Sequence, residues 1–183
     1  ISEKDSFRIQ VIDQSKGLSN KSVFDIYKDK GGNVWLATLG GINIIPPLSE
    51  GKGADSLSIE QLRGGREIPS DYILSIQEDS EGALWFGTLE EGVFRVAPKN
   101  AAPASNLKLD FLSRKLTIYN QMNGFNAKKI WNIFSTSKNE LWFASVENGI
   151  IRKRSGTSSD PKNIFENYTD NEGLSANAVN TVF

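Results

Sequence analysis

Short runs of β-branched and aromatic residues recur along this chain, and polar or glycine-rich residues separate each run from the next. Residues 23–27 form one such run, a Gly-Gly-Asn turn follows, and residues 34–38 form the next run. Runs of this length and composition predict β-strands, and the turn between them predicts a hairpin. The same pair of runs returns twice, so the pattern indicates a repeated unit. The later copies are residues 73–77 with 84–88, and residues 130–134 with 141–145.

Four segments can be followed through each repeat, and we name them A, B, C and D in chain order. Segment A begins at Val23, Ile73, Ile130 and Val179, so the successive periods are 50, 57 and 49 residues. Such periods are typical of propeller blades, each of which is a sheet of four strands. Segment C is residues 42–45, 93–96 and 150–153, and segment D lies around Ile9 and Ile12, Ile59 and Leu62, Leu116 and Tyr119, and Phe165 and Tyr168.

The predicted fold is therefore all-β, with one D strand, three complete blades of four antiparallel strands, and one A strand, which makes fourteen strands. Because a propeller closes with about four to eight blades, we expect a fragment of a larger propeller. The alternative is that the ends complete blades with another copy or another segment. One partial propeller covers residues 1–183, with repeats at about 17–66, 67–123 and 124–172, and the next repeat begins at 173–183.

The A–B turn and the C–D linker carry different signals. Gly32, Gly82 and Asn139 share one column of the A–B turn. Since Gly and Asn tolerate a positive φ, the turn is predicted to need that conformation. The C–D linkers at residues 46–58 and 97–106 are rich in Pro, Gly, Ser and Ala. We expect these linkers to be surface excursions that leave the core undisturbed.

Three tryptophans stand at one position of segment B, each followed two residues later by Ala or Gly. Their constant place predicts packing between neighbouring blades, and a ring of aromatic ligand platforms is the alternative. A hydroxyl residue ends each B segment and is expected to hydrogen-bond within the blade end. The tryptophans are Trp35, Trp85 and Trp142, and the hydroxyl residues are Thr38, Thr88 and Ser145. Segment A carries a column of small polar residues, which is expected to line a water-filled channel. These residues are Asp25, Ser75, Asn132 and Thr181.

Composition narrows the function classes. The 183 residues carry a formal net charge of −1, which gives no reason to expect nucleic acid or an anionic membrane as a partner. The chain has no Cys and no His, so thiol chemistry is excluded, and neither a metal nor a cofactor is expected. No apolar run approaches the roughly 18 residues that cross a bilayer.

Residues 23–38 resemble the two-component regulator propeller repeat, and so do residues 73–88. Residues 130–145 resemble it too, with Asn139 in the turn and Thr136 in place of the usual Asp. The opening Gly-Leu-Ser of that repeat is matched at Gly17-Leu18-Ser19 and at Gly173-Leu174-Ser175.

In that family, such repeats build the periplasmic sensor region of hybrid histidine kinases. Two seven-bladed propellers precede a β-sandwich, a membrane span and cytoplasmic signalling domains. The resemblance therefore implies a seven-bladed propeller, a periplasmic location, a glycan or oligosaccharide ligand, and a homodimer. The membrane would be reached only through other parts of the parent protein. This segment carries no kinase motif and is expected to be non-catalytic.

In a propeller, the D–A and B–C loops share one face, where loop chemistry varies over a constant scaffold. That face is the predicted ligand site, although ordinary solvated loop residues are the alternative. The candidate residues are Lys21, Lys128 and Lys129 for the carboxylates or sulfates of an acidic sugar, Asn20 and Asn126 for hydroxyl groups, and Tyr72 for stacking on a ring.

Two other functions compete with ligand sensing. One is an enzyme such as a propeller lyase of the streptogramin-lyase type, which resembles these repeats but relies on a catalytic histidine and a metal. The absence of His weakens this reading. The other is a protein-interaction scaffold like the WD-repeat propellers, which a large apolar patch on one face would favour.

Overall fold

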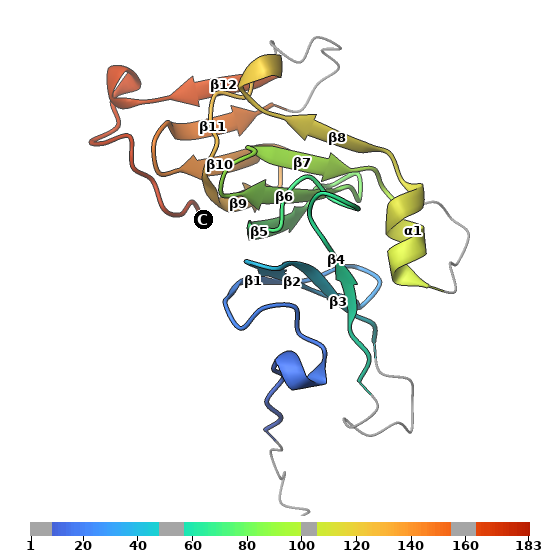
Figure 1. The fold of residues 1–183 in the computed structure, drawn as a ribbon. Helices are drawn as coiled ribbons and strands as arrows, with labels where there is room; N and C mark the ends of the chain where they lie inside the picture. The colour runs from blue at the N-terminus through green and yellow to red at the C-terminus, as the bar shows by residue number, and fades with distance from the viewer. Residues whose placement is uncertain (1–8, 48–56, 100–105, 155–163) are drawn as a thin grey trace, which may run out of the picture.

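The computed structural model describes residues 9–47, 57–99, 106–154 and 164–183. Within these ranges the chain forms three antiparallel sheets of four strands each (Figure 1). This confirms the prediction of all-β, four-stranded blades. The strands are β1 (Val23–Lys28), β2 (Val34–Thr38), β3 (Gly41–Ile45) and β4 (Glu60–Leu62) in the first sheet, β5 (Ile73–Glu78), β6 (Leu84–Thr88), β7 (Val93–Val96) and β8 (Leu116–Tyr119) in the second, and β9 (Ile130–Ser135), β10 (Leu141–Ser145), β11 (Gly149–Lys153) and β12 (Phe165–Tyr168) in the third.

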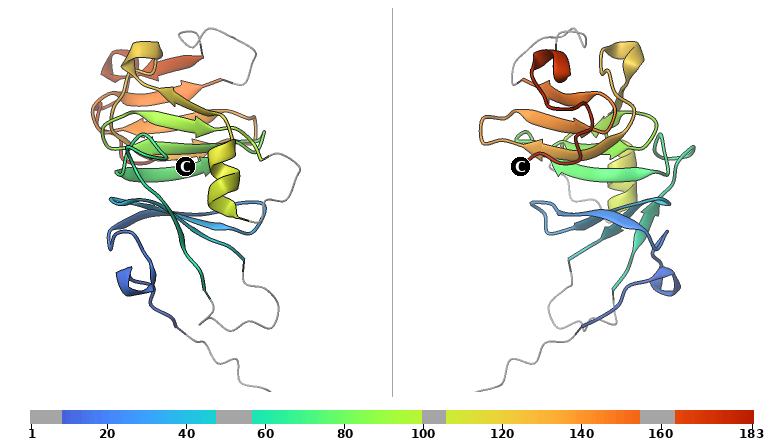
Figure 2. Two further views of the ribbon diagram at one scale, coloured as in Figure 1. Left: turned by 45° about the vertical axis from the view of Figure 1, so that its right-hand side comes forward. Right: turned by 90° about the vertical axis from the view of Figure 1, so that its left-hand side faces the viewer.

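Each sheet keeps the order of its strands in the sequence, so segment A forms the inner strand and segment D the outer strand. The inner strand β5 contacts both β1 and β9, which places the three inner strands together. Figure 2 shows the sheets stacked side by side, and they do not close into a ring. Short 3-10 helices η1 (Gln14–Lys16), η3 (Gln121–Asn123) and η5 (Asp170–Glu172) precede three of the D–A loops, and a helix α1 (Leu107–Ser113) lies between β7 and β8.

Two of the fourteen predicted strands do not form. The segment around Ile9 and Ile12 is not a strand, and Ile9 is 90% exposed. Residues 179–183 are not a strand either, although they lie against the third sheet, where the Val179 N–H donates to the Ser145 carbonyl at 2.9 Å. A D strand pairs with the C strand of its own blade, and an A strand pairs with its B strand. The given sequence holds neither of these partners, so no ladder can form.

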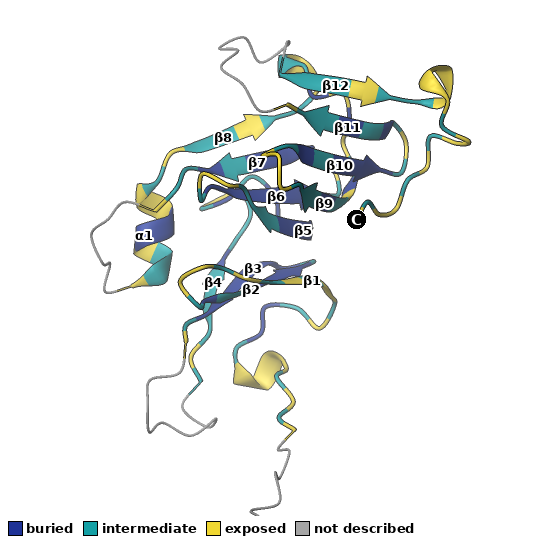
Figure 3. Cartoon of the chain, turned by 180° about the vertical axis from the view of Figure 1, so that it is seen from behind, coloured by how far each residue is buried: buried dark blue, intermediate teal, exposed yellow. Residues whose placement is uncertain are grey.

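Two of the three tryptophans of segment B pack between sheets, as predicted. Trp35 and Trp85 are buried in the two cores that join neighbouring sheets. The Trp85 ring lies 5.7 Å from the ring of Phe143 in the next sheet. Trp142 differs, because it is only partly buried and stacks on Tyr168 of its own sheet at 5.7 Å. The packing prediction is wrong for Trp142, since no fourth sheet covers it in the part of the chain that the structure describes. Burial is accordingly deepest in the second sheet (Figure 3).

The A–B turn adopts the predicted conformation in all three sheets. Gly32 and Gly82 have φ angles of 83° and 84°, and Asn139 has a φ of 64°. Asn139 is the non-glycine residue with positive φ in the described ranges. Its side chain is one of the few that tolerate this region, so Asn substitutes for Gly without changing the hairpin.

An aspartate in the A–B turn fixes each buried tryptophan. The Trp35 indole N–H donates to the Asp29 carboxylate at 2.9 Å, and the Trp85 indole donates to Asp79 at 2.8 Å. Asp79 also accepts from the backbone N–H of Ala83 at 2.9 Å. One carboxylate therefore satisfies the turn and a buried indole together, which explains why the repeat places Asp six residues before Trp.

In the third sheet, different residues make the contacts with the turn and with the indole. Thr136 stands at the aspartate position, and its hydroxyl accepts from the backbone N–H of Glu140. The Arg152 guanidinium pairs with the Glu140 carboxylate and holds the pKa of that carboxyl below its usual range, and a hydrogen bond with Trp142 acts in the same direction. Glu140 thus takes over the contact with the indole that an aspartate makes in the other two sheets.

The excursion between β7 and β8 reaches the core, because the helix α1 continues it beyond residue 106. Phe111 of α1 is buried between the first two sheets, with its ring 5.8 Å from Trp35 and 6.0 Å from Phe86. The Lys108 ammonium pairs with Glu67, before the second sheet, at 2.6 Å. These contacts come from the segment that follows the predicted linker, for which the sequence analysis predicted no element before Leu116. Most of both predicted linkers, residues 48–56 and 100–105, lies outside the described residues.

The small polar column of segment A bridges neighbouring blades. The Asp25 carboxylate accepts from the backbone N–H of Ile76 on the next inner strand at 2.8 Å. Asn132 makes the same kind of bond two repeats later, because its Oδ1 accepts from the Val182 N–H at 3.0 Å. The shorter Ser75 hydroxyl is buried and has no hydrogen-bond partner among the described residues. The column therefore holds inner strands together, a role that the sequence analysis did not assign to it.

Because the Asp25 carboxyl is partly buried at this bridge, we expect the stability of the fold to depend on pH. Burial raises the pKa of the Asp25 carboxyl from its ordinary value of 3.8, although hydrogen bonds from Ile76 and Ile26 act in the opposite direction. A raised pKa in the folded state means that stability falls as the pH rises from the unfolded pKa through the folded one. Asp25→Asn copies the natural Asn132, keeps an acceptor for Ile76 and removes this loss. Urea unfolding at pH 4 and pH 7 should show wild type losing stability relative to Asp25→Asn at the higher pH.

The control for this prediction is Asp25→Ala, which leaves the Ile76 N–H without its acceptor. We expect it to lower the free energy of unfolding by about 1–3 kcal/mol at both pH values. If the free energies of unfolding of wild type and Asp25→Asn differed by the same amount at both pH values, the raised pKa of Asp25 would be contradicted.

Candidate functional site

The D–A loops join the outer strand of one sheet to the inner strand of the next, and their backbone is pinned by a repeated hydrogen bond. At the start of each C strand, a glycine N–H donates to a carbonyl in the next D–A loop. The loops are therefore placed by the neighbouring sheet as well as by their own. The pairs are Gly41 to Asp71 at 2.7 Å, Gly92 to Lys128 at 3.0 Å, and Gly149 to Asn177 at 2.8 Å.

Glycine is required at this position for two reasons. Gly41 and Gly149 have φ angles of 92° and 73°, in the left-handed region. A Cβ on Gly41 would lie 2.0 Å from the Leu62 carbonyl oxygen, and one on Gly149 would lie 2.1 Å from the Tyr168 oxygen. The close approach of backbone to backbone therefore excludes any side chain here.

A buried polar cluster anchors the first D–A loop from below. The Ser19 N–H donates to Asn43 Oδ1 at 2.8 Å, the Asn43 amide donates back to the Ser19 hydroxyl at 2.6 Å, and Thr38 lies 2.9 Å from that hydroxyl. The sequence analysis missed Asn43, although a polar residue inside an apolar C segment was the available signal. Thr88 and Ser145 bond within their own blade ends, to Gly92 and Asn148, as predicted for this column.

The six candidate ligand residues all lie on D–A loops, so the fold brings them to one face of the stack. The structure does not gather them into either of the two pockets described below. Asn20 is partly buried, and its Oδ1 accepts from the Ser22 N–H at 2.9 Å, so that oxygen shapes the loop. Four of the other five candidates have exposed side chains: Lys21, Tyr72, Asn126 and Lys128.

Charge on this face is mixed rather than basic. The ammonium group of Lys129 pairs with the Glu147 carboxylate on the B–C loop of the third sheet. Lys21 and Lys128 occupy one column of the D–A loops, and the residue between them in the second sheet is Asp71. Asp71 Oδ1 accepts from the Gly64 N–H at 2.9 Å. The face therefore offers cations and a carboxylate in alternation.

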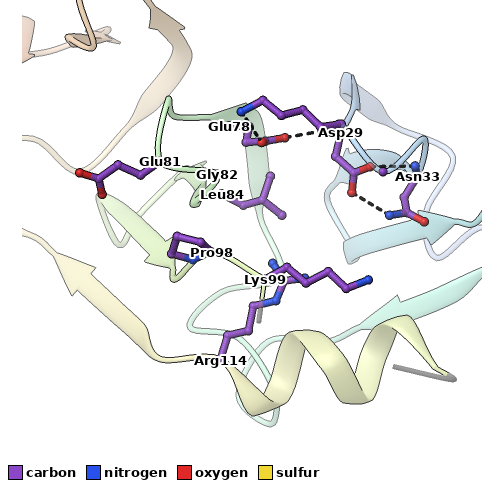
Figure 4. Close-up of a pocket in the computed structure, with 11 residues that line it drawn as sticks. Asp29, Asn33, Glu78, Glu81, Gly82, Leu84, Pro98, Lys99 and Arg114 are labelled. Carbon is purple, nitrogen blue, oxygen red and sulfur yellow. Dashed lines mark hydrogen bonds and ion pairs between the residues drawn. The ribbon is translucent and has the colours of Figure 1, made fainter. Parts of the chain in front are cut away.

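A pocket of about 220 Å³ opens on the opposite face, between the A–B turns of the first two sheets (Figure 4). The Lys30 ammonium pairs with Glu78 at 3.0 Å beside it. The Asp29 carboxylate is also engaged, since it accepts from the Asn33 side chain at 2.8 Å. Both carboxylates thus have partners inside the protein, and none of the six candidate residues lines this pocket.

A larger pocket of about 630 Å³ lies on the outer face of the third sheet, with Phe134, Trp142 and Ile150 among its walls. Their counterparts in the first sheet include Trp35 and Ile42, which are buried in the core against the second sheet. The pocket is therefore lined by residues whose counterparts in the first sheet are core residues.

Two stretches of the chain, residues 17–40 and 67–90, match the model of the two-component regulator propeller. In these two stretches the chain is similar to the two-component regulator propeller repeat. Each matched stretch runs from the start of a D–A loop through the A–B hairpin. It contains the aspartate, the tryptophan and the blade-end threonine whose contacts are described above.

Solved structures share the propeller fold of this chain. The extracellular domain of a protein described as the hybrid two component system BT3049 from B. thetaiotaomicron is 25% identical, with a TM-score of 0.67 over 92% of this chain and 19% of its own. PorZ of Porphyromonas gingivalis, described as a surface component of the type-IX secretion system, is 16% identical, with a TM-score of 0.61 over 87% of this chain and 23% of its own. The extracellular domain of BT4673 from B. thetaiotaomicron is 21% identical, with a TM-score of 0.56 over 80% of this chain and 19% of its own.

This chain spans about a fifth of the length of these proteins. No curated protein matches it. In the described part of the chain, no helix has the length and apolar character needed to cross a bilayer. Across the same ranges, no cluster of three or more acidic side chains is placed to hold a metal ion, and the sequence has neither His nor Cys.

Proposed function

We propose that this chain is part of the ligand-binding propeller of a periplasmic two-component sensor, and that its ligand is an oligosaccharide. The observation that carries the proposal is the D–A loop face. The neighbouring sheet fixes the backbone of the loops at Asp71 and Lys128, and the bonds between Ser19 and Asn43 anchor the first loop. Lys21, Asn126 and Lys128 keep exposed side chains. Fixed loops with free polar side chains suit recognition, because little conformational entropy is lost when a ligand binds.

Charge on the face supports a hydroxyl-rich ligand. Ammonium groups donate hydrogen bonds and carboxylates accept them, and sugar hydroxyls do both. Lys21, Asp71 and Lys128 follow one another in a single column of successive loops, so donors and an acceptor alternate along the face. An oligosaccharide lying across the loops would meet both kinds of group, and an acidic sugar would favour the two lysines.

The sensor part of the proposal is supported by the propeller repeats and by the likeness to the extracellular domain of a hybrid two-component system. We propose no catalysis by this segment. The chain has no histidine, on which the streptogramin-lyase type depends, and this favours binding over turnover.

Further blades of the same propeller are proposed to cover both outer faces of the stack. Ile26 on β1 is 66% exposed, whereas the corresponding Ile76 and Ile133 are 2% and 4% exposed inside inter-sheet cores. Trp142 on the other outer face is likewise the partly exposed member of its column. Each face carries residues that are core residues elsewhere in the same chain, which supports the same kind of neighbour on both sides. A homodimer, implied by the family resemblance, is proposed for the parent protein.

Calorimetric titration tests the function directly. The 183-residue chain is titrated with maltohexaose, cellohexaose, xylohexaose and a chondroitin sulfate hexasaccharide, and the mixtures are analysed for new products by chromatography. We expect binding of at least one sugar without turnover. The double variant Lys21→Gln/Lys128→Gln should weaken that binding about fivefold or more, because two charge-assisted hydrogen bonds are lost.

The matched control is Lys99→Gln, which removes an exposed lysine at the pocket on the opposite face. It should bind as wild type does. Product formation would favour the lyase, and silence across the panel would favour the protein scaffold, so either result overturns the proposed function.

A further inference from the structure

Each inner strand carries a β-bulge at the same place. The ladders between the inner strands and their B strands skip one residue, and the skipped residues are Phe24, Leu74 and Trp131. A bulge leaves its residue unpaired and re-aims the side chain, and bulges are over-represented beside functional sites. Three bulges in register therefore set aside one apolar side chain per blade, near the start of each inner strand.

Two of these side chains are exposed aromatic rings that meet. Phe24 is 42% exposed and Trp131 is 39% exposed, and their ring centroids lie 6.1 Å apart in an edge-to-face arrangement. The strand β5 contacts both β1 and β9, so the ring pair spans the position of Leu74. Leu74 is buried, yet it belongs to none of the three hydrophobic clusters of the described chain. We call Phe24, Leu74 and Trp131 the bulge platform.

Polar residues stand directly before the platform in the sequence. Lys21, Asp71 and Lys128 each precede a bulge residue by three positions, at the point where the D–A loop enters the inner strand. The backbone carbonyls of Asp71 and Lys128 accept hydrogen bonds from glycines of the preceding sheet, whereas Lys21 lies in the loop before the first sheet. Lys21 and Lys128 carry cationic donors and Asp71 carries an acceptor, and each precedes the inner strand that bears a platform residue.

This combination matches a sugar ring, which has an apolar face of C–H groups and an edge of hydroxyls. Aromatic rings bind such a face through dispersion and their quadrupole, and charged side chains bind the edge. We propose that the bulge platform is a subsite at which a pyranose ring of the oligosaccharide stacks on Trp131 and Phe24. This inference rests on the proposed function and adds residues that the loop analysis had left out.

Fluorescence and calorimetric titration with the same four hexasaccharides test the subsite on the 183-residue chain. Trp131→Ala and Phe24→Ala should each weaken binding about tenfold, and Trp131→Phe, which keeps a ring, about twofold. Sugar binding should quench tryptophan emission in wild type, and Trp131→Phe should abolish that quenching, because the other indoles lie away from the platform. Leu109→Ala, which changes an exposed apolar residue on α1, should bind as wild type does.

The outcomes separate this inference from the proposed function. If a sugar binds wild type and binds both alanine variants equally well, the subsite is wrong and the function stands. If no sugar binds wild type, both fall. If Trp131→Ala lowers the urea midpoint as strongly as a buried tryptophan would, the platform is a structural plug and the subsite is wrong.

Discussion

Trp85→Ala is expected to lower the free energy of unfolding by about 3–5 kcal/mol. The Trp85 ring is fully buried between the second and third sheets, where it contacts the rings of Tyr119 and Phe143. Its removal leaves a cavity that the surrounding strands cannot close, and it also leaves the Asp79 carboxylate without the indole donor. Urea unfolding followed by circular dichroism measures the loss as a lower midpoint at unchanged slope.

Two further variants separate the contributions. Trp85→Phe keeps an aromatic ring but loses the indole N–H, so we expect a smaller loss of about 1–2 kcal/mol. Trp131→Ala removes a partly exposed indole and should lower the free energy of unfolding by about 1 kcal/mol or less. Equal losses for Trp85→Ala and Trp131→Ala would mean that the inter-sheet packing of Trp85 does not hold the stack together.

Phe111→Ala should destabilise the chain about as strongly, by roughly 3–5 kcal/mol. Phe111 lies on a helix outside the repeat, yet its ring fills the core between the first two sheets beside Trp35 and Phe86. Its loss opens a cavity at that junction and releases α1 from the sheets. Urea unfolding gives the magnitude, and hydrogen exchange at β4 and α1 should show which part opens first.

Leu109→Ala is the matched control on the same helix. Leu109 is 65% exposed, and its removal should change the free energy of unfolding by about 0.5 kcal/mol or less. If Phe111→Ala were as mild as Leu109→Ala, α1 would not be part of the core between the first two sheets.

The blades could be predicted because their information repeats. When a column of tryptophans or glycines is compared across the copies, it locates the strands and the turns. Asn139 has a positive φ like the glycines of its column, which confirms that Asn replaces Gly because of the backbone geometry. The helix α1 has no counterpart in the other repeats, so a comparison of columns says nothing about it. The same reasoning explains Glu140, which replaces an aspartate from four residues away in the sequence and contacts the indole only through the folded turn.

The candidate site was predictable to the level of a face, and no further. Loop positions in the repeat place Lys21, Tyr72 and Lys128 on one side of the stack. Spacing alone does not show that Lys129 pairs with Glu147 or that Asn20 shapes its own loop. The bulges were also out of reach, because a skipped residue is visible only once two strands are paired.

The hydrogen bond from each C-strand glycine to the following D–A loop has a practical consequence for recombinant work. A gene trimmed at the start of a repeat would remove the carbonyl that Gly41, Gly92 or Gly149 needs, and so would damage the blade that is kept. A boundary in the excursion between C and D has the same effect, because it too lies between each glycine and its acceptor. Expression boundaries therefore need to keep the D–A loop that follows the last retained blade.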